Sequence, residues 1–528
     1  MRVRGSQAEA ATACGGTSFR DPVRPQLESL EAAGDAAGTP PAIFEAFTLS
    51  RYTNTIRRVA RKRPRDAALV LAVTAISSVL FVNLSLHGWP AGLQWLTIAW
   101  IVGIPSIAFL FLGYCMLARN NRFLLADPPP APSATHRTVI FTLVTLGREV
   151  AAIERSTRSV LYWTERCQRP DVKTQAWIVV EEPEFSIHAE RFDQLRSEGA
   201  VILVVPPTYR TAKDTRFKAR ALQYATEVRA KRGLADETAW VYHQDEETTV
   251  GEDTVLGIQE FVLTAKENVV CGSGIILHPL DWTGRATQFQ DLTHSFMDFQ
   301  VLYTMRHRRN LTPWFHGSHI LTRADSEAAI SWDMGTPSFC EDLLMAHFLR
   351  EKYGGRGFEI LKGFGYENAP FTVPDLLKQR KRWFRSHVYC ILKRRDTSLG
   401  RKALTVYGTV AWMAALPSVI AMFLAATIGV TSALPALGVF TGIAWGTIVL
   451  GYLRGVDLNR DYLPPKSLPI FQSIGNGLAG FFVDAIAPWY AVLAGKTGTH
   501  DFIRKDLPAV STPGASAAGP HSSIGPAH

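Results

Sequence analysis

Long apolar runs flank a polar middle part of the chain. Residues 67–86 and 93–117 contain no Lys, Arg, Asp or Glu. Each run is long enough for a helix that crosses the hydrocarbon core of a bilayer, which takes about 20 residues. With the short turn at residues 87–90, they predict a transmembrane helical hairpin over residues 67–118. A pair of buried core helices is the alternative, but a soluble helix normally keeps one polar face.

A second apolar region follows the polar middle part. Residues 404–430 and 433–452 each predict a membrane-spanning helix, and the less regular tract 481–494 predicts a third. Together they define a predicted C-terminal transmembrane region over residues 404–494.

The two ends of the chain have a different composition. Residues 1–42 and 508–528 contain many small residues and prolines without apolar periodicity, so we expect both segments to be disordered. The N-terminal segment lacks the apolar core of a secretory signal peptide.

Between the apolar regions, short β-rich runs alternate with polar, helix-like stretches such as residues 214–231. This βαβα order predicts an α/β domain over residues 138–395, with a mostly parallel sheet covered by helices on both faces. Ligands of such sheets bind beyond the carboxyl ends of the strands. The predicted strands cover residues 139–146, 176–180, 201–205 and 239–242.

The distribution of charge predicts how the chain is oriented in the membrane. The formal net charge is +9, and basic residues cluster beside the apolar runs, at residues 57–65 and 393–395. This placement predicts that the N-terminus and the α/β domain lie in the cytosol, which makes the chain a multi-pass membrane protein, of the plasma membrane by our expectation. A nucleic-acid partner would require a basic, aromatic face within the polar part, and none is evident. The six cysteines show no metal-ligand spacing, which favours unpaired thiols in a reducing compartment.

The first candidate for chemistry is an acidic cluster just past the fourth predicted strand. Asp245 and Glu247 lie two residues apart in a loop, where both side chains can turn toward one ligand. Their hard carboxylate oxygens suit Mg²⁺ or Mn²⁺ that bridges a diphosphate. An ordinary solvated acidic loop is the alternative.

Two further motifs follow along the chain. Glu341 and Asp342 open an amphipathic stretch, residues 342–353, where acids also serve as helix caps. Residues 379–383 have the sequence Gln-Arg-Lys-Arg-Trp and belong to a basic, aromatic stretch. An interfacial membrane helix explains that stretch as well as a binding site does.

The ordered set of acidic cluster, acidic pair and QxxRW resembles the membrane-integrated family-2 glycosyltransferases. The local sequences at residues 243–248 and 369–372 are most similar to Egghead-type β-1,4-mannosyltransferases. The resemblance implies a GT-A-like, Rossmann-like catalytic domain and a metal motif at residues 245–247. The family motif there is Asp-x-Asp, whereas this chain has Asp-x-Glu, which leaves the second ligand less certain.

The same resemblance implies roles on the acceptor side. Asp342 matches the general base that takes the acceptor proton, and the helix dipole is expected to keep its pKa low. Trp383 would stack on the acceptor sugar, which fits the affinity of aromatic faces for pyranose rings. Further residues that the resemblance places at the acceptor or the diphosphate are Gln379, Arg382, Glu341, Gly317 and Ser318.

On the donor side the resemblance implies nucleotide contacts. Lys218 and Arg220 match a KAxAL-type segment along the nucleotide, although a solvated helix face explains them equally well. Thr145 ends the first predicted strand. Glu181 and Glu182 end the second, where family members commonly carry an acid that binds the base or ribose, which makes Glu182 the nucleotide candidate. His316 and His319 make a metal site conceivable, but without a third ligand such a pair is more often structural.

These features predict an inverting, metal-dependent enzyme that transfers a hexose from a nucleotide-sugar to a lipid-linked or saccharide acceptor at the cytosolic membrane face. The donor can be of the GDP-mannose, UDP-glucose or UDP-GlcNAc type, and membrane lipids are further partners. A processive polysaccharide synthase that exports its polymer through its own helices is the first alternative. A non-catalytic, nucleotide-sensing membrane protein is the second, but it would not need the acidic pair.

Overall fold

A computed structural model describes residues 44–61, 135–279, 316–335, 341–370, 372–392, 398–428, 453–462 and 470–494, with isolated positions between them. The chain divides into two units, Met1–Ala46 and Phe47–His528. In the first unit, the described part is the short 3₁₀ helix η1 (Phe44–Ala46), so the predicted disorder of residues 1–42 lies outside the described residues. The remaining description concerns the second unit.

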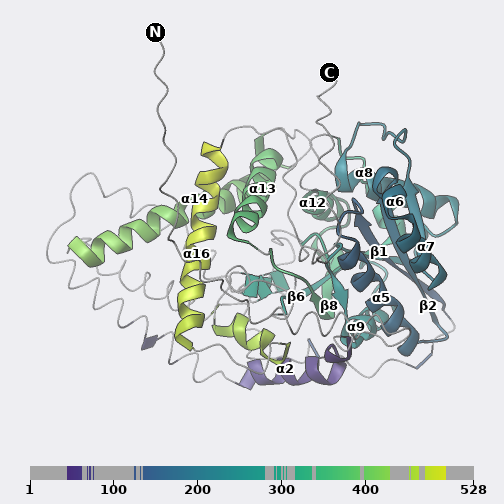
Figure 1. Ribbon diagram of the computed structural model, residues 1–528, viewed down its shortest axis with the longest axis horizontal. Helices are drawn as coiled ribbons and strands as arrows, with labels where there is room; N and C mark the ends of the chain where they lie inside the picture. The colour runs from purple at the N-terminus through teal and green to yellow at the C-terminus, as the bar shows by residue number, and fades with distance from the viewer. Residues whose placement is uncertain are drawn as a thin grey trace, which may run out of the picture. The chain divides into compact units, whose positions relative to one another are not determined.

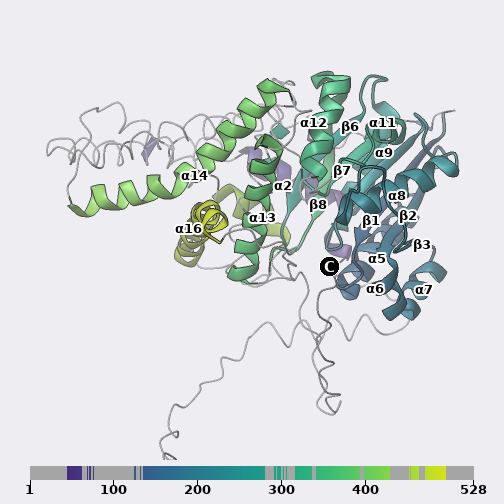
Figure 2. The same cartoon turned by 90° about the horizontal axis from the view of Figure 1, so that it is seen from above.

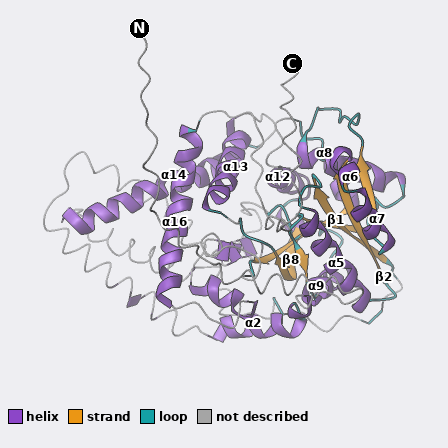
Figure 3. Cartoon of the chain, viewed as in Figure 1, coloured by secondary structure: helices purple, strands orange, loops and turns teal. Residues whose placement is uncertain are grey.

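Its centre is an eight-stranded sheet with the strand order β3-β2-β1-β4-β7-β6-β8-β5. Figure 3 draws the strands in orange. The first four strands in this order are mutually parallel. All four strands predicted from the sequence belong to this half. The strands are β1 (Arg137–Thr145), β2 (Val172–Glu181), β3 (Val201–Val205), β4 (Ala239–Gln244), β5 (Thr249–Val250), β6 (Cys271–Leu277), β7 (Ile320–Arg323) and β8 (Phe358–Tyr366).

The other half corrects the expectation of a mostly parallel sheet. Strand β7 runs antiparallel to both β4 and β6, and β5 runs antiparallel to β8. Only β6 and β8 form a parallel pair there. The sheet is therefore mixed, because the regular βα alternation that the sequence displays ends at β4.

Helices cover both faces of the sheet, as predicted. Because successive side chains of a strand point to opposite faces, Val139 and Phe141 of β1 pack in one core with α5 and α9. Ile140 and Val144 face the other core, with α8 and α12. The helices are α5 (Val150–Arg166), α6 (Glu182–Ile187), α7 (Ala189–Ser197), α8 (Phe217–Lys231), α9 (Glu252–Thr264), α11 (Ala324–Ile330), α12 (Glu341–Tyr353) and the 3₁₀ helix η4 (Gly355–Gly357).

Glycines allow α9 to lie directly on β8. A Cβ atom built on Gly257 would lie 2.2 Å from the carbonyl oxygen of Lys362. Gly363 has a φ of +87°, and its Cβ would lie 2.5 Å from the carbonyl oxygen of Asp253. Asp253 in turn accepts hydrogen bonds from the backbone of Phe364 at 2.8 Å and from the Tyr366 hydroxyl at 3.0 Å. Burial raises the pKa of Asp253 to about 7.

An N-terminal helix, α2 (Leu49–Arg61), packs on the same edge of the domain. Its Tyr52 ring meets Phe364 edge-on at 4.6 Å between centroids. Arg58 forms ion pairs with Asp457 and Asp461. The segment before the first predicted span and the segment after residues 433–452 therefore meet against the α/β domain.

Three long helices, α13 (Val373–Leu392), α14 (Leu399–Ile428) and α16 (Ile470–Leu493), pack against one another (Figures 1 and 2). The 3₁₀ helix η5 (Arg460–Tyr462) precedes α16. The predicted hairpin over residues 67–118 lies almost entirely outside the described residues, as do most of residues 433–452. Within the part of the chain that the structure describes, no helix is both long and apolar enough to span a bilayer.

The close contact of α9 with β8 predicts that Gly257→Ala destabilises the domain. The added methyl group would clash with backbone atoms of Lys362, which cannot rotate away. Overpacking of this kind costs about 1–3 kcal/mol, more than Ala gains over Gly in a helix. Thermal unfolding of the purified protein measures the effect. Gly400→Ala is the matched control, because a Cβ there meets no atom within 4 Å. Equal melting temperatures for both variants would contradict the prediction.

Candidate active site

The acidic cluster lies beyond the carboxyl end of β4, where parallel sheets bind ligands. Asp245 opens a tight turn, in which the Thr248 amide donates to the Asp245 carbonyl at 3.0 Å. The Thr248 hydroxyl accepts a hydrogen bond from the Asp245 amide at 3.1 Å. These hydrogen bonds fix the backbone of the turn, and therefore the place where the Asp245 side chain begins.

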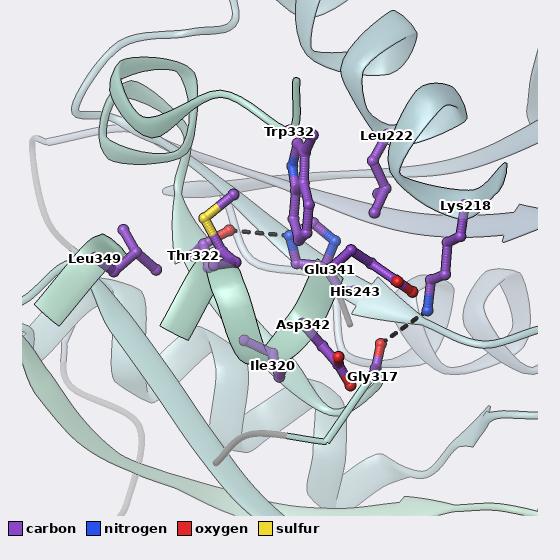
Figure 4. Close-up of a pocket in the computed structure, with 11 residues that line it drawn as sticks. Lys218, Leu222, His243, Gly317, Ile320, Thr322, Trp332, Glu341, Asp342 and Leu349 are labelled. Atoms are coloured by element: carbon purple, nitrogen blue, oxygen red, sulfur yellow. Dashed lines mark hydrogen bonds between the residues drawn. The ribbon is translucent and has the colours of Figure 1, made fainter. Parts of the chain in front are cut away.

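Three distant segments converge on Gly317, in the loop before β7 (Figure 4). A Cβ atom built on Gly317 would lie 3.3 Å from Asp245 Oδ2, 3.5 Å from Asp342 Oδ2 and 3.5 Å from Lys218 Nζ. The absence of a side chain at this position therefore creates the space between the two carboxylates. The structure thus brings together Asp245, Asp342, Lys218 and Gly317, all predicted from the sequence as site residues.

Lys218, in the first turn of α8, supplies positive charge to this cluster. Its ammonium pairs with Asp245 and donates to the Gly317 carbonyl at 3.1 Å. Burial disfavours the charged form, but Asp245 and Glu341 outweigh that cost and raise the pKa of Lys218 above its ordinary value.

Glu341 and Asp342 form the first turn of α12. Asp342 accepts a hydrogen bond from the Leu343 amide at 2.8 Å. Burial and the neighbouring acid raise the pKa of Glu341 to about 7. Burial also raises the pKa of Asp342, although Lys218 partly offsets it. The expected low pKa of Asp342 is therefore wrong, because burial and like charges outweigh the helix dipole at this position.

A narrow pocket extends from these groups toward the sheet. Its polar mouth is formed by Lys218, Glu341 and Asp342, and its inner wall is mainly apolar. His243 and Trp332 contribute rings to that wall, with centroids 5.4 Å apart. The other lining residues are Leu222, Gly317, Ile320, Thr322, Met345 and Leu349.

A buried charge network supports this wall from behind. Glu327 is fully buried and pairs with Arg229 at 2.6 Å. It also accepts hydrogen bonds from Trp332 Nε1 at 2.6 Å and Thr322 Oγ1 at 3.0 Å. Burial would raise the pKa of Glu327, but Arg229 and His243 hold it well below its usual range.

Glu367, which the sequence analysis did not single out, joins two of the site loops. Its carboxylate accepts hydrogen bonds from Ser318 and, at 2.9 Å, from Thr248. Ser318 was predicted as a site residue, and the structure gives it this positioning contact beside Gly317. Nothing in the sequence distinguishes Glu367 from other acids near the ends of strands.

On the predicted nucleotide side, the contacts of the candidate residues differ from those expected from the sequence. Arg220 binds Glu181 at 2.7 Å and the carbonyl of Pro206 at 2.6 Å, so it ties the end of β2 to the loop after β3. Glu182 is exposed at the start of α6. The acid that lies against Arg220 is thus one residue earlier than the candidate.

The Thr145 hydroxyl accepts the Gly147 amide at 2.8 Å and donates to Glu246. Burial and Glu247 raise the pKa of Glu246 to about 7. Glu247 is also buried, with 3% of its surface exposed, and it is not among the groups nearest to Gly317. Within the described residues, no group of three or more Asp, Glu, His or Cys side chains forms a metal cluster.

The two histidines of the 316–319 loop have different partners and do not face a common ligand position. His316 pairs with Asp298, and the Tyr242 hydroxyl lies 2.8 Å from His319 Nδ1. Burial lowers the pKa of His319 to about 3, whereas Asp298 overcomes the effect of burial and raises the pKa of His316 to about 9. The arrangement supports the structural alternative for His319.

Helix α13 carries the QxxRW segment, whose positions have unlike surroundings. Arg380 is buried, pairs with Asp291 and Asp484, and contacts the Gln379 side chain. Its guanidinium lies 4.2 Å from the centroid of the Trp383 ring. Arg382 carries its charge near the acidic pair instead: burial raises the pKa values of Glu341 and Asp342, and Arg382 offsets a minor part of that rise.

Comparison with known proteins places this site in a family. A model of the glycosyl transferase family group 2 matches residues 240–451, which contain the acidic cluster, the acidic pair and QxxRW. The Beta-1,4-mannosyltransferase egh of Drosophila melanogaster is 33% identical over 186 residues, which cover 34% of this chain and 39% of that protein. The Beta-1,4-mannosyltransferase bre-3 of Caenorhabditis elegans is 28% identical over 215 residues, or 40% of this chain and 45% of that protein.

The aligned parts thus span less than half the length of these curated relatives. Among solved structures, the mannosyltransferase PcManGT from Pyrobaculum calidifontis, in complex with GDP-Man and Mn²⁺, aligns with 75% of this chain and 99% of its own. The TM-score is 0.43 and the identity 15%. The family model and the curated relatives thus relate residues 240–451 of this chain to glycosyltransferase family 2. The family match and the mixed α/β sheet together support the GT-A-like assignment of its catalytic domain.

The unlike surroundings of the two arginines in QxxRW give a prediction. Arg380→Met removes the arginine partner of buried Asp291 and of half-buried Asp484, and breaking a buried ion pair costs about 3–5 kcal/mol. Arg382→Met removes a half-buried charge and should change the unfolding free energy by no more than about 0.5 kcal/mol. Chemical denaturation of both variants checks this difference. Equal losses of stability would show that the two arginines do not have separate roles.

Proposed function

We propose that this protein is an inverting, metal-dependent glycosyltransferase that transfers a hexose from a nucleotide-sugar to a lipid-linked or saccharide acceptor. The observation that carries the proposal is the convergence of Asp245, Asp342 and Lys218 around Gly317. This cluster offers a proton acceptor, a cation ligand and a cationic partner for a diphosphate within one small volume.

Asp342 is the proposed general base. Its raised pKa brings its basicity closer to neutral pH, where a general base works best, provided that its ionised form is retained. The acceptor oxygen would lose its proton to Asp342 while it forms a bond to the anomeric carbon. The bond from that carbon to the diphosphate breaks in the same displacement, so the configuration inverts. Lys218 and Arg382 carry the positive charge that the departing diphosphate needs.

The residues around Gly317 fit a divalent cation. Asp245 and Asp342 present carboxylate oxygens on either side of the space that a Cβ atom of residue 317 would fill. Such oxygens are the ligands that Mg²⁺ and Mn²⁺ prefer. Asp245 would hold the cation, with Glu247 as the second candidate ligand. The bound ion would neutralise the diphosphate of the donor.

Mannose from GDP-mannose is the first donor that we propose. Two of the curated relatives are named as β-1,4-mannosyltransferases. UDP-glucose and UDP-GlcNAc are the alternatives, because the described site distinguishes neither the base nor the sugar.

We further propose that the enzyme is an integral membrane protein with its catalytic domain in the cytosol. The apolar runs and their basic flanks support this, as do exposed apolar side chains on α14 and α16. The contact of α2 with residues 457–461 adds a constraint: both segments lie on the side of the catalytic domain. The chain would then cross the bilayer an even number of times between residues 61 and 137, and again between residues 398 and 453. The exposed apolar residues are Val406, Val410, Ile420, Phe482, Ile486, Tyr490, Val492 and Leu493.

Asp342→Asn tests the proposed chemistry. The substitution keeps the size and the Leu343 contact but removes the proton acceptor, so transfer from the preferred donor should fall by about 10²–10⁴-fold. Release of nucleotide from a panel of GDP- and UDP-sugars, with Mg²⁺ or Mn²⁺, measures the rate. Nucleotide affinity, measured by calorimetry, should stay near that of the unchanged protein.

Glu341→Gln provides the matched control, because it removes the neighbouring carboxylate and should have a milder effect. Turnover of Asp342→Asn within a few-fold of the unchanged protein would remove Asp342 from the role of base. Loss of nucleotide binding in that variant would assign it to the cation site instead.

The proposed topology is testable by cysteine labelling in intact cells and in opened membranes. Single cysteines introduced at exposed Lys231 and at Arg460 should both react only after the inner face becomes accessible. A cysteine in the turn at residues 87–90 should react from the outside. Labelling of position 231 from the outside would contradict the cytosolic placement, since nucleotide-sugar donors are cytosolic by this proposal.

A further inference from the structure

Lys218 is bound to the same carboxylate that the proposed cation needs. Its ammonium pairs with Asp245 and also donates to the carbonyl of Gly317, which lines the space between the carboxylates. The side chains of Lys218 and Asp245 keep 23% and 32% of their surface exposed, so neither is locked in the core. The ion pair is therefore electrostatically favourable, but both side chains can still change partners.

A divalent cation at Asp245 would share this carboxylate with the ammonium. The two positive charges would repel each other at short range in a partly buried site, which weakens the binding of both. Movement of the ammonium away from Asp245 would therefore favour metal binding. Lys218 has four rotatable side-chain bonds, so it can leave Asp245 without unfolding α8.

The loop before Lys218 holds the helix start in place during such a movement. Asp333 accepts hydrogen bonds from the Thr215 hydroxyl at 2.6 Å and from the Lys213 amide at 2.9 Å. Phe217 has a φ of +57°, in the left-handed region that non-glycine residues seldom adopt. Asp333 thus ties down the loop at residues 213–215, directly before the first turn of α8.

We propose that Lys218 competes with the divalent cation for Asp245. A nucleoside diphosphate relieves this competition, because it gives the ammonium a second partner. The cation then binds Asp245 while Lys218 pairs with the diphosphate. The inference rests on the proposed function, because it assumes that Asp245 holds the metal ion. It adds that nucleotide and metal bind cooperatively, and that Lys218 is the residue that couples them.

The test measures Mn²⁺ binding to the full-length protein with and without GDP or UDP. The electron paramagnetic resonance signal of free Mn²⁺ reports how much of the ion is bound. In the unchanged protein, a saturating nucleoside diphosphate should tighten Mn²⁺ binding by about tenfold or more, a typical coupling between linked sites. Lys218→Met should bind Mn²⁺ about tenfold more tightly than the unchanged protein without nucleotide, and nucleotide should tighten its Mn²⁺ binding by a smaller factor than in the unchanged protein.

Lys231→Met is the matched control, because it removes a lysine from the exposed end of the same helix. It should show the unchanged Mn²⁺ affinity and coupling. Thermal melting checks folding, and Lys218→Gln replaces Lys218→Met if the latter does not fold.

The possible failures are distinguishable. If Lys218→Met and Lys218→Gln bind Mn²⁺ as the unchanged protein does, Lys218 does not compete, and the inference is overturned while the proposed function stands. If no variant binds Mn²⁺ with or without nucleotide, the metal site of the proposed function is overturned, and the inference with it. If Asp245→Asn does not weaken Mn²⁺ binding, the metal ion lies elsewhere and the competition has no basis.

Discussion

The concentration of negative charge around Gly317 is the constraint on which the rest of the site depends. Asp245 and the adjacent Glu341 and Asp342 come from two segments about 100 residues apart, and burial together with mutual repulsion raises the pKa values of the α12 pair. Lys218 offsets part of this charge. Such a cluster stabilises whatever additional cation approaches it, and a metal-bound diphosphate group is a ligand with matching chemistry.

This charge is held in place by a second set of buried polar contacts beneath it. Glu367 fastens the turn after β4 to the loop before β7, through Thr248 and Ser318. Glu327, paired with Arg229, fixes the pocket wall. These acids have partners on several sides, so they act as rigid supports for the site. The division agrees with the general requirement that an active site be preorganised by the residues around it.

The sequence predicts those parts of the molecule that depend on neighbouring residues in the chain, such as a strand recognised from its run of apolar residues. Strands β1 and β4 are recognisable because both faces are buried, and Asp245 is correctly placed because it follows β4 directly. The antiparallel strand β7 has only four residues and no local pattern of its own. Glu367 and Glu327 cannot be found from the sequence, since their role depends on contacts between distant segments. The pKa of Asp342 was misjudged for the same reason: the helix start is visible in the sequence, whereas its burial is not.

The QxxRW segment shows why a structural and a functional interpretation of one motif can both hold. Successive residues of an α-helix are about 100° apart, so Arg380 and Arg382 lie about 200° apart, on nearly opposite faces of α13. One face turns Arg380 toward Asp484 of α16, which anchors the helix. The other face brings the charge of Arg382 to the acidic pair of α12. Trp383 lies next to Arg380 across one turn, so the anchor that fixes the helix also fixes the aromatic ring. One face of the helix thus serves packing, and the other places positive charge near the acidic pair.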